Sequence, residues 1–209
     1  MRTSYNRIAG QSVERSAALS DGVFAVAMTL LVLDLRAPAV EAVHNEQDLW
    51  LALGALAPRL VICAMTFMTL GIFWVGQQTQ LNHLSRSDRR LSWMHILFLF
   101  AVSMTPFSTM LLAGFIAYRI ALLVYWVNLL LLGGTLYFTW VCAAGLGLVR
   151  DDISPAVATA IKRRIVIGQS LYAFGALLCL VSTYVSIGFI VLVQLSYAVA
   201  PRLPGRGRQ

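Results

Sequence analysis

Polar side chains inside apolar stretches are the first place to look for chemistry in this chain. The segment "RSAALSDGVFAVAMTLLVLDL", residues 15–35, carries Arg15, Ser20 and Asp21 at the start of an otherwise apolar run. Ionisable groups inside a bilayer are either paired or functional. Asp21 therefore has two interpretations. It can cap a helix start, where the helix dipole favours a negative charge and Arg15 is near, or it can belong to a functional site.

Patterns for enzyme chemistry are missing from the sequence. His95 lies in an apolar stretch without a nearby cysteine or carboxylate, and we interpret it as a buried, hydrogen-bonded residue. The cysteines are isolated from one another and are interpreted as small core residues, namely Cys63, Cys142 and Cys179. Paired carboxylates, nucleophile–base pairs and metal-ligand spacings do not occur. We therefore predict a protein that is not an enzyme and that uses no cofactor or fixed metal.

Composition identifies the solvent of these residues. The chain has 209 residues, of which 59% are hydrophobic and 12% charged, and its mean hydropathy is +0.76. These values predict an all-α polytopic membrane protein. A bilayer core of roughly 30 Å takes about 20 apolar residues per helix. We predict six spans in a single domain over residues 1–209, at about 17–35, 49–75, 91–113, 117–148, 165–182 and 183–200, with a disordered basic tail at 201–209.

The boundary between the last two spans is the least defined. Residues 165–199 contain no charge, and only a tight turn near "STYVS" divides them. The alternative is one long helix, which would give five spans and place the termini on opposite sides of the membrane.

The net charge of +7 is explained by the distribution of Lys and Arg residues over the two sides of the membrane. With six spans, most Lys and Arg residues fall on the side of the two termini, and only Arg36, Arg59 and Arg119 fall on the other side. The positive-inside rule then predicts cytoplasmic termini in a cell membrane. The basic loops are expected to meet anionic lipid head groups, so membrane lipids are predicted partners and nucleic acid is not.

A helical wheel of the first span separates two faces. At about 100° per residue, Asp21 lies roughly 140° from an apolar stripe, and Thr29 lies on the flank of that stripe. The stripe consists of Gly22, Val26, Leu30 and Leu33. One helix does not reveal whether such a stripe faces a pore or lipid.

Three segments resemble the transmembrane protein 175 family of potassium channels. The segment "ALSDGVFAVAMTLLVLDLRAP" is similar to the family signature at Ser20, Asp21 and Thr29. The segments "FWVGQQ" and "LSWMHILFLFAVSMTPFSTMLLAG" resemble the second and third helices, at Trp74, Trp93 and residues 106–109. The chain departs from the pattern at Leu19, where a Phe is usual, and at Gln77 and Gln78, where histidines are common.

The resemblance implies a homotetramer around one central pore that the first helix of each subunit lines. It implies that Val26 forms a hydrophobic constriction, with Leu30 and Leu33 as the apolar positions above it, and that Thr29 contributes to selectivity. A structural network is implied to hold the pore helix, formed by Arg15, Ser20, Asp21, Trp74, Trp93 and His95. The departures lie in this network, so they bear on gating and any pH response rather than on conduction.

The predicted function is a potassium-preferring cation channel with modest selectivity over sodium. Potassium would pass near Val26 and Thr29, because nothing in the sequence resembles a carbonyl-lined "TVGYG" filter. The alternative is a proton-linked carrier or exporter that uses Asp21 and Asp34, and a third possibility is a scaffold without flux.

Overall fold

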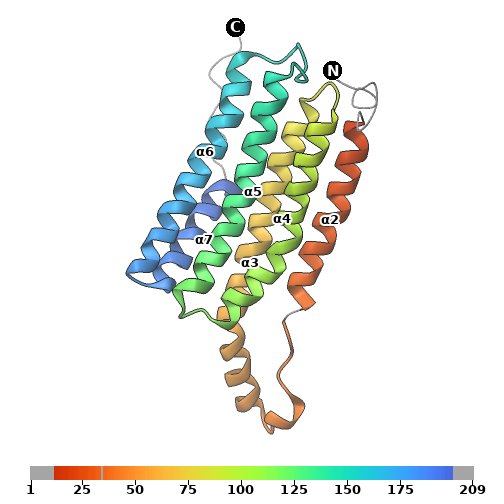
Figure 1. The fold of residues 1–209 in the computed structure, drawn as a ribbon. Helices are drawn as coiled ribbons and strands as arrows, with labels where there is room; N and C mark the ends of the chain where they lie inside the picture. Colours follow the sequence, from red (N-terminus) through yellow and green to blue (C-terminus); the bar gives the residue numbers. More distant parts are fainter. Residues whose placement is uncertain (1–11, 34, 200–209) are drawn as a thin grey trace.

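Six α-helices and two short 3₁₀ turns make up the computed structural model over the residues it describes, 12–33 and 35–199. Their bounds are α2 Val13–Leu33, η1 Val40–Ala42, α3 Glu46–Asn82, α4 Arg89–Gly114, α5 Arg119–Gly145, α6 Pro155–Leu177, η2 Leu178–Leu180 and α7 Thr183–Val199. The helices lie side by side in one bundle (Figure 1). Asp34 and the tail at 201–209 fall outside the described residues.

The prediction of an all-α polytopic membrane protein with six helices is confirmed. Five helices are long and apolar enough to cross a membrane, and the sixth is a shorter apolar helix, Thr183–Tyr197. The alternative of one long helix over residues 165–199 is wrong, because η2 separates α6 from α7.

The start of α6 differs from the apolar run that we used to place it. The helix begins at Pro155 rather than near Ile165. The Ser154 side chain accepts a hydrogen bond from the Val157 backbone N–H, and Pro155 occupies the first turn, where its missing N–H costs nothing. These capping signals start the helix before the apolar run, so the basic residues at 162–164 lie within α6.

The longest helix, α3, extends beyond the bundle. It has 37 residues, which gives a length of about 55 Å, well above a hydrocarbon core of roughly 30 Å. Figure 1 shows its first part projecting past the ends of the neighbouring helices. Cys63 donates a hydrogen bond to the Leu31 carbonyl at 3.5 Å, which places Cys63 level with the last turn of α2. The residues of α3 that precede Cys63 therefore form most of the projection.

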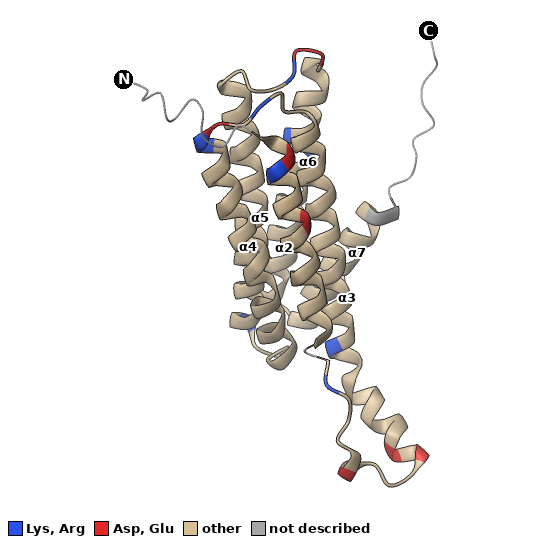
Figure 2. Ribbon diagram, turned by 90° about the vertical axis from the view of Figure 1, so that its right-hand side faces the viewer, with Lys and Arg blue, Asp and Glu red and all other residues tan. Residues whose placement is uncertain are grey.

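Most charged residues lie towards the ends of the bundle, whereas Asp21 lies about two turns inside α2. Figure 2 shows Lys and Arg near both ends and acidic residues at the tip of the projecting part of α3. Glu46 and Asp48 belong to that tip, and Asn45 caps the helix there by accepting from the Asp48 N–H at 2.9 Å.

Hydroxyl side chains in the helices bond mostly to their own helix. Thr66, Thr69 and Thr105 each lie within hydrogen-bond distance of the carbonyl four residues earlier, at 3.0, 3.0 and 3.1 Å. Several of these oxygens also accept from another helix. The Gln194 amide of α7, for example, donates to Thr69 of α3 at 2.6 Å. The buried hydroxyls thus satisfy a donor locally and join helices through a spare lone pair.

Candidate pore-lining helix and its anchoring network

One face of α2 is buried against the other helices of the chain. Ser20, Phe24, Ala27 and Leu31 are all buried, at the spacing of a single helical face. They pack against α3 and α4. The Phe24 ring lies against Phe98 of α4, with ring centroids 6.0 Å apart. These contacts fix the rotation of α2 about its axis.

The opposite face of α2 carries the stripe found in the sequence, and the rest of the chain leaves it uncovered. The side chains of Val26, Leu30 and Leu33 are 58%, 44% and 75% exposed. Leu19, Gly22, Val26 and Leu30 line an open groove of about 500 Å³ together with Ser103 of α4. A Cβ atom added to Gly22 would meet nothing within 4 Å. The stripe is therefore free to face a pore, lipid or another protein chain.

Thr29 lies exposed on the flank of this stripe. Its hydroxyl donates a hydrogen bond to the Val26 carbonyl at 2.8 Å. Because the proton is used within the helix, the Thr29 oxygen presents its lone pairs outward, where they can accept a hydrogen bond or contact a cation.

Asp21 joins α2 to α3 through one carboxylate oxygen. Its Oδ1 accepts hydrogen bonds from the Trp74 indole N–H and from the Gln78 amide, both at 2.8 Å. Trp74 and Gln78 are four residues apart, so they lie on the same face of α3. Hydrogen bonds to an ionised acceptor are the stronger kind. Asp21 thus anchors α2 rather than only capping it.

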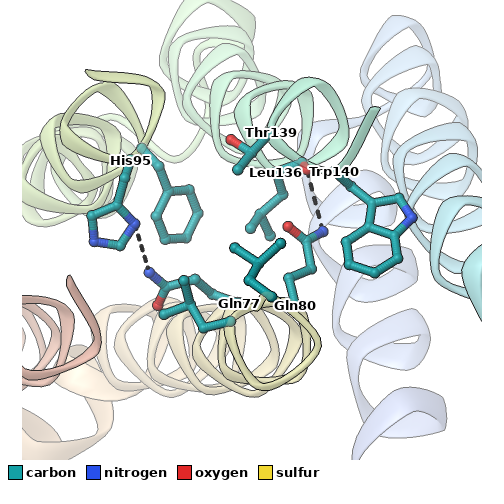
Figure 3. Close-up of a pocket in the computed structure, with 9 residues that line it drawn as sticks. Gln77, Gln80, His95, Leu136, Thr139 and Trp140 are labelled. Atoms are coloured by element: carbon teal, nitrogen blue, oxygen red, sulfur yellow. Dashed lines mark hydrogen bonds between the residues drawn. The ribbon is translucent and has the colours of Figure 1, made fainter. Parts of the chain in front are cut away.

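A second, buried set of contacts joins α2, α3 and α4. Ser20 Oγ lies 3.0 Å from His95 Nε2 and accepts a hydrogen bond from the Gln77 amide at 2.7 Å. The same amide lies 3.2 Å from His95 Nδ1, the contact dashed in Figure 3. His95 Nε2 is also 3.1 Å from the Ser16 carbonyl. His95 is thereby a buried, hydrogen-bonded residue, as its sequence context indicates.

A small cavity of about 20 Å³ lies beside this set. Figure 3 shows the side chains around it, which come from α3, α4 and α5 and, at Leu84, from the segment between α3 and α4. Gln80 closes one side by donating to the Leu136 carbonyl at 3.2 Å. Gln77 Oε1 is buried and has no hydrogen-bond partner within the described residues.

The structure brings together four of the six residues of the predicted network. Ser20, Asp21, Trp74 and His95 lie in the two sets of contacts, whereas no salt bridge among the described residues joins Arg15 to Asp21. The Trp93 side chain is exposed, and among the described residues it makes no hydrogen bond to either set of contacts. The roles of Arg15 and Trp93 stay predictions.

Gln77 and Gln78 lie in the network, as the sequence indicated, but their part as hydrogen-bond donors to α2 was not predicted. Both side chains supply amide donors to residues of α2. The available signal was the four-residue spacing of Trp74 and Gln78, which puts both on one helix face. Among the described residues, His, Cys, Asp and Glu form no group of three that could hold a metal ion.

Several known proteins resemble this chain in sequence. A family model described as endosomal/lysosomal potassium channel TMEM175 matches residues 15–106, the region from α2 into α4. A potassium channel of Streptomyces collinus is 30% identical over 88% of this chain and 90% of its own. A potassium channel of Chamaesiphon minutus is 28% identical over 88% of this chain and 93% of its own.

A solved structure also has this fold. The crystal structure of a lysosomal potassium-selective channel TMEM175 homolog from Chamaesiphon minutus superposes with a TM-score of 0.79 at 27% identity, covering 91% of this chain and 98% of that one. The mouse endosomal/lysosomal proton channel TMEM175 is 32% identical, over only 46% of this chain and 20% of its own.

Proposed function

Because the chain belongs to the TMEM175 family of potassium channels, we propose that it conducts potassium through a pore lined by α2 of four identical subunits. The family is one of ion channels and not of enzymes. The observation that carries the proposal is the division of α2 into two faces. One face holds the helix to its own subunit, and the other presents Val26, Leu30 and Leu33 uncovered.

Four copies of that stripe form an apolar ring around the pore axis. Val26 makes the constriction, and Leu30 and Leu33 continue the apolar wall. A narrow apolar ring stops ions by dewetting and conducts when it widens. Gating is then a change in the spacing of four α2 helices, which the contacts of Ser20 and Asp21 limit.

Thr29 supplies the discrimination between cations. Its hydroxyl proton is held by the Val26 carbonyl at 2.8 Å, so four oxygens would face the ion beside the constriction. Four hydroxyl oxygens replace only part of a hydration shell, and their number and field strength set the preference. Selectivity for potassium over sodium is therefore modest.

The channel sits in the cell membrane with both termini in the cytoplasm. The basic loops between α3 and α4 and between α5 and α6 lie on the same side as the start of α2 (Figure 1). The excess of Lys and Arg on that side favours a cytoplasmic orientation and contact with anionic lipid head groups.

Flux through purified protein in liposomes tests the proposal. Vesicles loaded with potassium chloride are diluted into sodium chloride, and a proton ionophore with a pH-sensitive dye reports potassium efflux. We expect protein-dependent dye quenching that weakens when the vesicles contain sodium. Saturable, concentrative uptake without single-channel currents would instead identify a carrier, and folded protein without any flux would identify a scaffold.

A pair of valine substitutions tests the assignment of the constriction. Val26→Ala should raise single-channel conductance, because it widens the narrowest ring. Val32→Ala is the matched control, since Val32 is equally exposed on α2, at 57%, but lies off the stripe. Equal conductance in Val26→Ala and the parent protein would remove Val26 from the pore.

A further inference from the structure

A second uncovered stripe runs along α3. Large apolar residues recur every seven positions at Leu53, Leu60, Phe67 and Trp74, and all of them are between 39% and 49% exposed. Small residues alternate with them at Ala57, Ala64 and Gly71, which are exposed or half-exposed. Spacings of three and four residues over several turns are typical of a coiled-coil seam. We call these seven residues the α3 seam.

Only one part of the α3 seam lies at the level of the bilayer core. Arg59 lies one turn before Cys63, which is level with the end of α2, and Arg36 comes three residues after Leu33, the last residue of α2. Arginines at this level mark the head-group region. The residues from Glu46 to Pro58 therefore project about 20 Å beyond the bilayer core.

The projecting part is nevertheless apolar. Residues 49–57, "LWLALGALA", contain no charge, and Trp50 is 69% exposed. An apolar helix face of this size in water is typical of a protein–protein contact. The seam continues in the same register from the projecting part into the membrane. A single partner that covers the whole seam must therefore contact both a part in water and a part at the level of the lipid. A protein surface does this, and lipid does not.

The seam also ends beside the pore helix. Trp74, its last large residue, holds the Asp21 carboxylate of α2 at 2.8 Å. A second protein chain packed on the seam would therefore lie next to α2. In the proposed channel of four subunits, α2 is the helix that lines the pore. We propose that the α3 seam is the surface onto which a second copy of this chain packs. The inference rests on the proposed assembly of identical subunits.

Paired glycine substitutions test the part of the seam inside the membrane. A Cβ atom added to Gly71 or to Gly134 would meet nothing within 4 Å in the single subunit, and both glycines are half-exposed in helices. Gly71→Leu should therefore fold as a subunit but lose the tetramer, because the leucine blocks close approach of a neighbour. Gly134→Leu, on α5, should keep it. The measurement is the mass of the assembly in nanodiscs or detergent, with helix content from circular dichroism.

A pair of lysine substitutions tests the projecting part of α3, where water can solvate a new charge in the monomer. Ala57 is on the seam and Ala55 is on the other side of the same helix, and both are exposed. Ala57→Lys should shift the protein from tetramer to monomer, and Ala55→Lys should not.

The outcomes separate this inference from the proposed function. A tetramer that conducts and survives both Gly71→Leu and Ala57→Lys would overturn the inference and leave the channel assignment intact. A parent protein that is monomeric in lipid and carries no flux would overturn both. If Gly71→Leu fails to fold, the lysine pair decides.

Discussion

The bond between the Trp74 indole and the Asp21 carboxylate should carry a measurable coupling energy. Asp21 Oδ1 accepts from Trp74 Nε1 at 2.8 Å. Hydrogen bonds to charged groups contribute about 1.5–3 kcal/mol. Asp21 is exposed, Trp74 is partly exposed and the same oxygen also accepts from Gln78, so the lower end of that range applies. We expect a coupling of about 1.5 kcal/mol, slightly more than a tenfold change in the folding equilibrium.

A double-mutant cycle measures this coupling. Asp21→Ala, Trp74→Phe and the double variant are unfolded reversibly by SDS in mixed micelles at fixed protein concentration, with helix content as the signal. Trp74→Phe keeps the ring and removes the indole N–H. The control cycle pairs Asp21→Ala with Trp93→Phe, because Trp93 is exposed and its ring has no bond to Asp21 in the described chain.

Two results would refute the reasoning. Additive effects of Asp21→Ala and Trp74→Phe, within about 0.5 kcal/mol, would mean that the bond does not hold α2 to α3. A larger coupling to Trp93 than to Trp74 would mean that the anchor of α2 lies on α4 instead.

The remaining predictions concern ion preference and helix packing. Thr29→Val keeps the shape of the side chain and removes its oxygen, so the preference for potassium over sodium should fall while current remains; an unchanged reversal potential under bi-ionic conditions would contradict the role of Thr29. Gly133→Ala should destabilise the protein by about 1–3 kcal/mol, because its Cβ would overlap the Gln169 side chain that lies across Gly133. Gly134→Ala meets nothing and should be neutral or slightly stabilising, and thermal unfolding in detergent compares the two; equal melting temperatures would contradict the contact.

The number and type of the helices could be predicted from sequence because bilayer thickness sets their length. Helix starts were less predictable where capping and hydropathy disagree. The sequence "SP" at Ser154 and Pro155 starts α6, yet the basic residues at 162–164 made that stretch look like a loop. The span over 49–75 had the opposite problem. Because this span is apolar, the sequence did not indicate that α3 starts at Glu46 and extends beyond the membrane.

The two faces of α2 could be predicted from sequence because helical periodicity fixes which side chains share a face. A wheel of the first span predicts an apolar stripe that includes Val26 and Leu30, and in the structure both side chains are exposed, whereas Phe24 on the other side of the helix is buried. Contacts between helices were not predictable in the same way. Gln77 reaches Ser20 only because α3 crosses α2 at that level, and no local pattern reports where two helices meet.

The hydroxyl groups that bond to their own helix have a consequence for biogenesis. A threonine such as Thr66, Thr69 or Thr105 brings its proton donor into the bilayer already satisfied by the preceding turn, so each helix can leave the translocon without waiting for a partner. Contacts such as that from Gln194 to Thr69 need form only afterwards, when the last helix has been synthesised. Membrane insertion and the assembly of the bundle are thereby separable steps for this chain.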